Sequence, residues 1–139
     1  MQKEIKTTIL INARPSQVWA VLTDFKKYPD WNPFVKMLKG EVKVGSTIEV
    51  NLQGMRFKPE VLTYLENEEF RWKGKLWIKG IFDGEHIFSL KENQDGTTTF
   101  EHREKFNGIL VRALSKKLDT ETKSGFKAMN IALKERVEA

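Results

Sequence analysis

One long amphipathic segment near the C-terminus most limits how this chain can fold. From Ile109 to Val137, residues suited to a core recur every three or four positions and Lys, Glu and Arg fill the positions between them, as on a helix with one buried face. The stripe consists of Val111, Leu114, Leu118, Thr122, Phe126, Met129, Leu133 and Val137. Such a helix, roughly 40 Å long at 1.5 Å per residue, needs another layer of structure over its apolar face.

Gly125 lies inside this predicted helix. Glycine costs about 1 kcal/mol relative to alanine in a helix interior, so its presence there needs a reason. Close backbone packing is the commoner reason, and room for a ligand is the alternative.

The residues before this helix predict antiparallel β-strands. Lys3 to Asn12 alternates between two faces, with isoleucines and Thr7 on one of them, which is the period of a half-buried strand. Val35 to Asn107 contains six further runs separated by glycine or polar turns. The sequence therefore predicts an α+β fold in which a curved, seven-stranded antiparallel sheet wraps around one long C-terminal helix.

The segment from Pro15 to Phe34, between the first two predicted strands, is dense in aromatic residues and prolines. Its first proline suits the first turn of a helix. Pro29 and Pro33 disfavour helical conformation at Tyr28 and Asn32, so a second, broken helical turn should follow. We expect these two short helices to close one end of the sheet. Their packing anchors are Trp19 and Trp31.

Composition favours a single domain over residues 1–139, because 40% of the chain is hydrophobic and can form a sizeable core. The chain has no cysteine, which excludes disulfides and thiolate chemistry and favours a cytoplasmic location. Its N-terminus lacks the apolar run of a signal peptide, and no segment has the length of a membrane span. We therefore expect no stable membrane insertion.

The charge pattern excludes some partners. The net charge is +5, but the 24 basic residues are spread among 19 acidic ones without a dense basic run. Such lysines are typical of a solvated surface, so we expect no nucleic-acid partner. The nine glycines form neither a P-loop nor a dinucleotide pattern, so we expect no organic cofactor. The sequence leaves the oligomeric state open.

Two histidines and a glutamate are polar residues that fall in phase with apolar neighbours. His86 alternates with phenylalanines and a leucine on its predicted strand, and His102 and Glu104 alternate with phenylalanines on the next. If Asn93 to Thr97 forms a five-residue hairpin loop, Phe88 pairs with His102 and His86 pairs with Glu104. That register places an imidazole opposite a carboxylate on the face toward the helix.

Three interpretations of His86, His102 and Glu104 stay open. They are satisfied polar groups that orient the hydroxyl or carbonyl of a ligand in an apolar pocket. Alternatively, His86 is a general acid/base whose tautomer Glu104 fixes, which suits a dehydration or an aldol-type cyclisation. A metal site of two histidines and one carboxylate is the third interpretation. The sequence favours the first, and we predict no metal.

The space between a curved sheet and a single helix is the default place for a ligand. Besides the three polar residues, its predicted lining consists of Phe57, Val61, Phe70, Trp72, Phe82, Phe88, Phe100, Leu118, Thr122, Phe126 and Met129. Trp77 follows a glycine and is a candidate for the pocket rim. Packing within the core is the alternative role for each aromatic residue.

The run P-x-x-V-W-x-x-L-T-D-F-x-x-Y-P-x-W-N-P-F at Pro15 to Phe34 resembles the START-related superfamily, also called SRPBCC or birch-pollen-allergen-like. Within it, the chain is similar to the polyketide cyclase/dehydrase and lipid-transport group. Residues 70–74, 80–90 and 96–108 agree with this resemblance, which covers essentially the whole chain. It implies the helix-grip fold, with a hydrophobic ligand held between the sheet and the C-terminal helix.

Relatives with this fold bind lipids, sterols or quinones, cyclise polyketides, or activate a chaperone, so function depends on the site. We expect a protein that binds or carries a hydrophobic small molecule that is lipid-, quinone- or polyketide-like. A cyclase or dehydratase that uses His86 and Glu104 is the first alternative. A co-chaperone-like interaction module is the second, and a filled interior with an exposed apolar patch would favour it.

Overall fold

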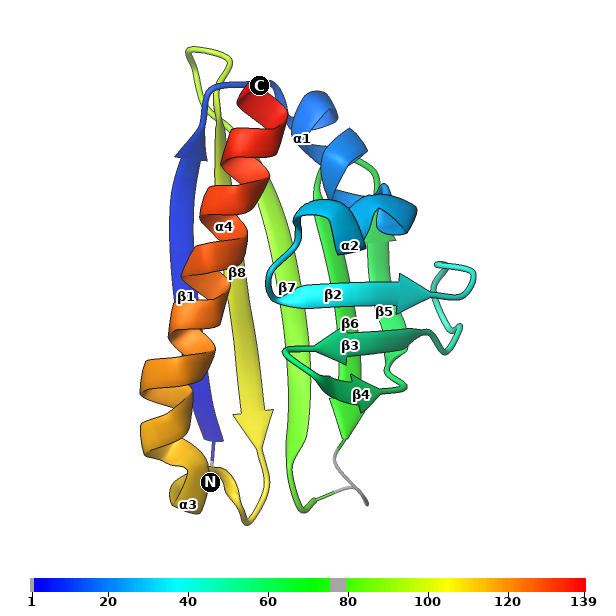
Figure 1. Cartoon of the computed structure of the whole chain (residues 1–139), viewed down its shortest axis with the longest axis vertical. Coiled ribbons are helices and arrows are strands. Elements are labelled where there is room, and N and C mark those ends of the chain that lie inside the picture. Colours follow the sequence, from blue (N-terminus) through cyan, green and yellow to red (C-terminus); the bar gives the residue numbers. More distant parts are fainter. Residues whose placement is uncertain (1, 76–79) are drawn as a thin grey trace.

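The computed structural model describes residues 2–75 and 80–139 (Figure 1). In chain order the elements are β1 (Gln2–Ile11), α1 (Pro15–Leu22), a 3₁₀ turn (Phe25–Lys27), α2 (Tyr28–Trp31), β2 (Val35–Lys39), β3 (Glu49–Leu52), β4 (Met55–Phe57), β5 (Glu60–Leu65), β6 (Glu69–Lys75), β7 (Asp83–Glu92), β8 (Thr98–Asn107), α3 (Val111–Lys117), a π-helical turn (Leu118–Thr122) and α4 (Lys123–Glu138). The predicted rim residue Trp77 lies outside the described residues.

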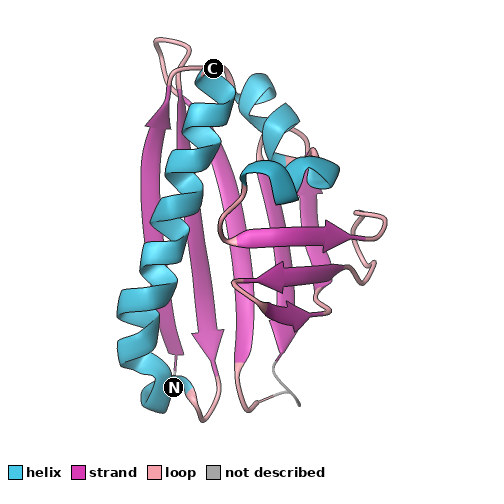
Figure 2. Ribbon diagram, in the orientation of Figure 1, coloured by secondary structure: helices cyan, strands magenta, loops and turns pink. Residues whose placement is uncertain are grey.

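The strands form two antiparallel sheets. The larger sheet has the order β1-β8-β7-β6-β5, and the smaller one has the order β2-β3-β4. Helix α4 runs along the β1 side of the large sheet, where it makes its main contacts (Figure 2). The ring of Phe34, immediately before β2, contacts both His86 of β7 and Phe126 of α4. The small sheet therefore meets α4 over one face of the large sheet, which confirms the predicted α+β helix-grip arrangement.

The prediction of one seven-stranded sheet is wrong in count and continuity, because the described residues form a five-stranded and a three-stranded sheet. One of the six strands predicted after the first, covering Met55 to Leu65, is instead split at Pro59. Proline has no N–H to donate to a ladder. Met55–Phe57 stays in the small sheet as β4, whereas Glu60–Leu65 joins the large one as β5. The carbonyl of Pro59 accepts a hydrogen bond from Ile48 N at this crossover.

The segment between β1 and β2 follows the prediction with one exception. Pro15 opens α1, and Asn32 is extended before Pro33. Tyr28, however, is helical although Pro29 follows it. Burial overrides the local preference, because the Tyr28 ring is fully buried and its hydroxyl donates a hydrogen bond to the Leu22 carbonyl. Burial also raises the pKa of this phenol.

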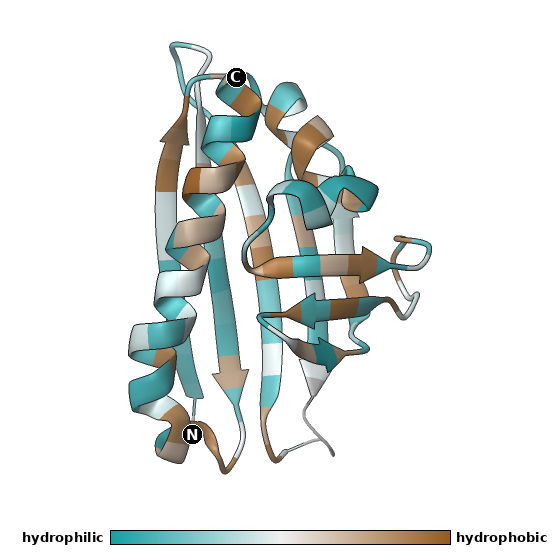
Figure 3. Ribbon diagram, in the orientation of Figure 1, coloured by the Kyte–Doolittle hydropathy of each residue, from teal (hydrophilic) through white to brown (hydrophobic). Residues whose placement is uncertain are grey.

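The C-terminal helix runs from α3 through the π-helical turn into α4, close to the predicted bounds. Most of its predicted stripe is buried, with Leu114, Thr122 and Val137 half-buried. Figure 3 shows hydrophobic and hydrophilic residues alternating along it. The glycine in this helix is explained by close packing, because a Cβ on Gly125 would lie 2.7 Å from Cδ1 of Phe34 and would also clash with the amide of Gln53.

We predict that Gly125→Ala lowers the free energy of unfolding by about 1–3 kcal/mol, as overpacking does in a well-packed interior. The helix-propensity gain of about 1 kcal/mol is too small to offset the clash with the Phe34 ring. Urea unfolding measures the change. The matched control is Ser124→Ala on the exposed side of the same turn, which should leave the protein as stable or slightly more stable. A Gly125→Ala variant as stable as this control would contradict the close contact.

Candidate functional site

The three polar residues predicted for the interior lie on neighbouring strands and face α4. In the observed register, His86 of β7 pairs with Glu104 of β8, and Phe88 pairs with His102. The loop between these strands spans residues 93–97 as predicted. All three side chains are buried, with His86 and His102 fully inaccessible and Glu104 8% exposed. The sequence therefore predicted both their register and their direction.

A row of polar contacts crosses the interior from β8 to β1. Oε1 of Glu104 lies 3.2 Å from Nδ1 of His86, and Nε2 of His86 lies 2.7 Å from Nε2 of His102. On its other side, His102 Nδ1 lies 2.9 Å from Oδ1 of Asn130. The amide of Asn130 donates to Oγ1 of Thr7 at 2.8 Å, and this hydroxyl donates to the His102 carbonyl. We call these five residues the polar row.

The hydrogen bonds in the polar row determine where its protons lie. Because Asn130 donates to Thr7, its Oδ1 accepts from Nδ1–H of His102. A neutral His102 then accepts at Nε2 from Nε2–H of His86. His86 Nδ1 and the Glu104 carboxylate are consequently two acceptors that need one proton between them. Their contact is poorly aligned, since Nδ1 of His86 has no partner with hydrogen-bond geometry.

Burial keeps His102 neutral. Desolvation, reinforced by the neighbouring His86, lowers the pKa of the His102 imidazole well below 6.5, whereas the hydrogen bond to Asn130 acts in the opposite direction. Desolvation prevails because the ring is inaccessible to water. The proton pattern inferred from the hydrogen bonds therefore agrees with the electrostatics.

A glycine on β7 makes room for the carboxylate at the end of the row. A Cβ at Gly84 would collide with Oε2 of Glu104, which occupies the space above this residue. Gly84 is the neighbour of His86 on the same face of the strand. The missing side chain therefore lets Glu104 lean across β7 toward the imidazole.

Aromatic rings enclose the two histidines. Trp72 stacks on His86 with 4.9 Å between ring centroids, and Phe126 stacks on His102 at 4.0 Å. Phe34 lies 5.8 Å from each imidazole, and Phe88 lies 4.8 Å from each. Side chains thus fill the space around the histidines. The Phe34 ring enters this space from the side of the small sheet.

The predicted lining separates into a central group and a peripheral one. The buried residues of the predicted lining form the central group, which consists of Val61, Phe70, Trp72, Phe88, Phe100, Leu118, Phe126 and Met129. Phe57, Phe82 and Thr122 are half-buried. Phe82 stacks on Phe106 at 5.5 Å, and Phe57 belongs to β4 of the small sheet. The buried rings of Trp72, Phe88, Phe100 and Phe126 contact the histidines, whereas Phe57 and Phe82 lie on the margin.

Sequence reasoning missed Phe34 and Asn130 as partners of the histidines. Asn130 carries a visible signal, because it follows Phe126 by four residues and precedes Leu133 by three, within the buried stripe. A polar residue in such a stripe needs a buried partner. Phe34 carries no comparable signal, since its contact with α4 depends on how two sheets meet.

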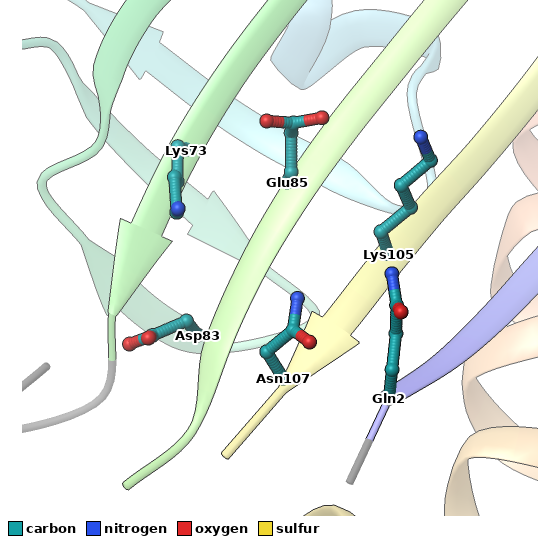
Figure 4. Close-up of a pocket in the computed structure, with 6 residues that line it drawn as sticks. All are labelled: Gln2, Lys73, Asp83, Glu85, Lys105 and Asn107. Carbon is teal, nitrogen blue, oxygen red and sulfur yellow. The ribbon is translucent and has the colours of Figure 1, made fainter. Parts of the chain in front are cut away.

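Two surface cavities are lined by neither histidine. One, of about 200 Å³, is lined by Gln2, Lys73, Asp83, Glu85, Lys105 and Asn107 on the opposite face of the large sheet (Figure 4). Its charged lining is unsuited to a hydrophobic molecule. The other, of about 410 Å³, lies between β1 and α4. Within residues 2–75 and 80–139, no group of three His, Cys, Asp or Glu side chains has the geometry of a metal site.

The fold and the buried polar row define a helix-grip protein with an enclosed, largely aromatic interior. The sequence matches the family described as polyketide cyclase / dehydrase and lipid transport over residues 2–138, and the chain belongs to this family. No curated protein matches the sequence significantly. In the described residues, no helix is both long and apolar enough to span a membrane.

Solved structures with the same fold come from bacteria and plants. A hypothetical protein from Helicobacter pylori is 15% identical, with a TM-score of 0.81 over 97% of this chain and 88% of that one. A START superfamily protein from Mycobacterium smegmatis is 22% identical, with a TM-score of 0.73 over 97% of both chains. Norcoclaurine synthase from Thalictrum flavum is 13% identical, with a TM-score of 0.75 over 99% of this chain and 87% of that one.

We predict that His102 makes the folded protein less stable in mild acid. The unfolded chain takes up a proton at this imidazole near pH 6.5, whereas the folded protein does not, because its His102 pKa is lowered. Its contribution to the free energy of unfolding is therefore complete above about pH 6.5. It falls by about 1.4 kcal/mol per pH unit below that value.

Urea unfolding from pH 7.5 to pH 5 tests this, with His102→Gln as the variant that keeps a polar side chain but cannot titrate. The wild type should lose more stability than the variant over this range. Equal losses in the two proteins would show that His102 is protonated as readily in the folded state as in the unfolded one.

Proposed function

We propose that this protein binds a hydrophobic small molecule with one polar group, in the interior between the large sheet and α4. The single observation that supports this is the polar row buried among aromatic rings. The rings provide a surface for an apolar body, and the Glu104 end of the row provides a hydrogen-bonding group for a hydroxyl or carbonyl. The other predicted lining residues, including Phe70, Phe100 and Met129, form the surrounding wall in this proposal.

The Glu104–His86 contact supports a role in recognition beyond packing. Buried polar groups usually have well-aligned partners, and a fully satisfied pair would suffice for stability. Nδ1 of His86 instead has no partner with good geometry. An apolar core of the same volume is often at least as stable as a buried ionisable pair. A ligand group that completes the bonding of His86 and Glu104 gives this arrangement a function.

A ligand must displace a side chain to reach the row, and we propose that Phe34 is that side chain. Phe34 lies between α2 and β2, where the backbone belongs to neither element. Its ring contacts His86, His102 and Phe126. Asn32 accepts hydrogen bonds from the backbone N–H groups of Phe34 and Val35, so the backbone can stay in place while the ring rotates away.

Similar structures are compatible with an aromatic ligand. The norcoclaurine synthase structure is a complex with dopamine and hydroxybenzaldehyde, both small aromatic molecules with polar groups. Another similar structure is the di-domain ARO/CYC StfQ from the steffimycin biosynthetic pathway. These relatives share only the fold with this chain at 13% and 12% identity. They lead us to choose aromatic molecules as probes. The expectation of a cytoplasmic location is a separate one and accompanies this proposal.

Catalysis by His86 and Glu104 is a second candidate, supported by their 3.2 Å contact. A general acid/base needs a ring nitrogen that can reach the substrate. Nε2 of His86 faces His102 and Nδ1 faces Glu104, so a substrate would have to displace one of these two neighbours before a cyclisation or dehydration could begin. Equal turnover of a candidate substrate by the wild type and by His86→Ala would exclude this role.

The filled space around the histidines is also what an interaction module would have. That alternative needs a continuous exposed apolar surface. The large exposed apolar residues in the described part of the chain are Leu10, Val44, Met55, Leu65, Ile109 and Ile131. They come from six different segments of the chain, so no single helix or strand of the described residues presents an apolar face to a partner, and we prefer the small-molecule proposal.

We predict that 2-naphthol binds about tenfold more tightly than 2-methylnaphthalene, which has the same shape but no hydroxyl. A hydrogen bond to a charged group contributes about 1.5–3 kcal/mol, and tenfold in affinity corresponds to about 1.4 kcal/mol. Glu104→Gln keeps the size of the side chain and removes the carboxylate, so it should reduce this preference. Isothermal titration measures the four affinities. Equal binding of both molecules to the wild type would contradict recognition by the row.

We also predict that shortening Phe34 strengthens binding of both probes several-fold, because the ligand no longer has to displace its ring. Phe34→Ala tests this directly, and Phe34→Leu does so if the larger truncation unfolds the protein, since such truncations cost about 3–5 kcal/mol. The matched control is Leu22→Ala, at a fully buried position in α1, which should leave affinity unchanged. Weaker binding by both Phe34 variants would show that this ring is part of the wall.

A further inference from the structure

A second cavity lies on the outside of the grip, between the edge of the large sheet and the C-terminal helix. It has a volume of about 410 Å³ and is lined by Lys6, Thr7, Thr8, Ile9, Lys123, Lys127, Asn130 and Ile131. Strand β1 is the outermost strand of its sheet, and α4 runs beside it (Figure 1). We call this cavity the edge groove. It shares Thr7 and Asn130 with the polar row and contains none of the aromatic residues around the histidines.

The edge groove has a strongly positive lining. Three of its eight residues are lysines and none is acidic. Lys6 is paired with Glu101 at 3.4 Å, whereas Lys123 and Lys127 form no ion pair with any residue in 2–75 or 80–139. Lys123 and Lys127 are one helical turn apart, where like charges repel. An anion between them would relieve that repulsion.

The free edge of β1 adds backbone donors to this positive charge. Nζ of Lys134 donates to the Leu10 carbonyl, and Asn12 N donates to Oε2 of Glu138. The backbone N–H and C=O groups of the even-numbered residues therefore point away from β8, toward the C-terminal end of α4. Backbone groups of alternate residues point to the same side of a strand. The N–H of Thr8 therefore points toward the groove and is free to bind an acceptor.

The groove also has an apolar part. Ile9 is half-buried, and Ile131, which follows the buried Asn130 in α4, is 52% exposed. Two isoleucines beside two ammonium groups suit a molecule that combines a short aliphatic body with a carboxylate. Such a molecule would cover Ile131 and bring its carboxylate to Lys123, Lys127 and the Thr8 N–H.

We propose that the edge groove binds a small carboxylate with a short aliphatic body, at a site separate from the interior. The carboxylate accepts hydrogen bonds from Lys123, Lys127 and the backbone of Thr8, and the aliphatic body contacts Ile9 and Ile131. Asn130 lies in the groove wall and bonds to His102. Its amide therefore reports on occupancy of the groove.

Amide NMR of the ¹⁵N-labelled protein during titration with hexanoate tests the proposal. Two further titrations separate the contributions, with hexanol for the aliphatic body alone and inorganic phosphate for the charge alone. The groove variant is Lys123→Gln/Lys127→Gln. The matched control is Lys26→Gln/Lys27→Gln, which removes the same charge from exposed positions in the 3₁₀ turn. All four positions are exposed, so both variants should keep the wild-type spectrum elsewhere.

Hexanoate should give saturable shifts at Thr8, Ile9, Asn130 and Ile131. Its affinity should fall at least tenfold in the groove variant and less than threefold in the control. Hexanol and phosphate should each bind at least tenfold more weakly than hexanoate.

Equal affinities of hexanoate for the two variants would overturn the proposal. The lysines would then serve only to keep the exposed edge of β1 from pairing with another chain. Phosphate binding as tight as hexanoate would also overturn it, in favour of a general anion site. Shifts confined to Trp72, His86 and Phe126 would place hexanoate in the interior, which contradicts the edge groove and supports the interior site.

Discussion

The 2.7 Å contact between the two imidazoles is the interaction on which the interior depends. Two buried rings can share a hydrogen bond only if one accepts, so His102 must be neutral at Nε2. Asn130 enforces this by accepting a hydrogen bond from the N–H of the other ring nitrogen, and burial, which lowers the pKa of His102, also favours the neutral ring. The positions of the protons from Thr7 to Nε2 of His86 follow from these contacts. The contact also ties β7 and β8 to α4 through polar groups in an otherwise apolar region.

The second constraint is that one helix cannot cover five strands. Helix α4 lies over the β1 side of the large sheet, and the small sheet with the short helices provides further cover. Phe34 and Gly125 meet where these parts join, and the histidines lie directly beneath, within 5.8 Å of the Phe34 ring. The place where two covering parts meet is also the place where an interior can open with the least disruption. This is why the proposed ligand site and the packing of Gly125 belong to one account.

Much of this arrangement was predictable from local patterns. A five-residue loop and the alternation of phenylalanines with His86, His102 and Glu104 sufficed for the register and direction of all three side chains. The split at Pro59 and the helical Tyr28 were missed, because each depends on tertiary contacts that override or redirect a local preference. The hydrogen-bond partner of His86 was also only half predicted. Glu104 is its strand neighbour, whereas its ring nitrogen Nε2 faces His102 diagonally, and Asn130 reaches His102 from a helix 28 residues away in sequence.

The most direct test of the central claim is a long-range ¹H–¹⁵N spectrum of the two imidazoles at pH 7, recorded before and after saturation with 2-naphthol. The account predicts a neutral His102 with its proton on Nδ1 in the free protein. On binding, the ring nitrogens of His86 should shift, because the ligand hydroxyl joins the polar row. A charged His102 in the free protein, or imidazole signals that stay unchanged while 2-naphthol is bound, would contradict the claim that this row recognises the ligand.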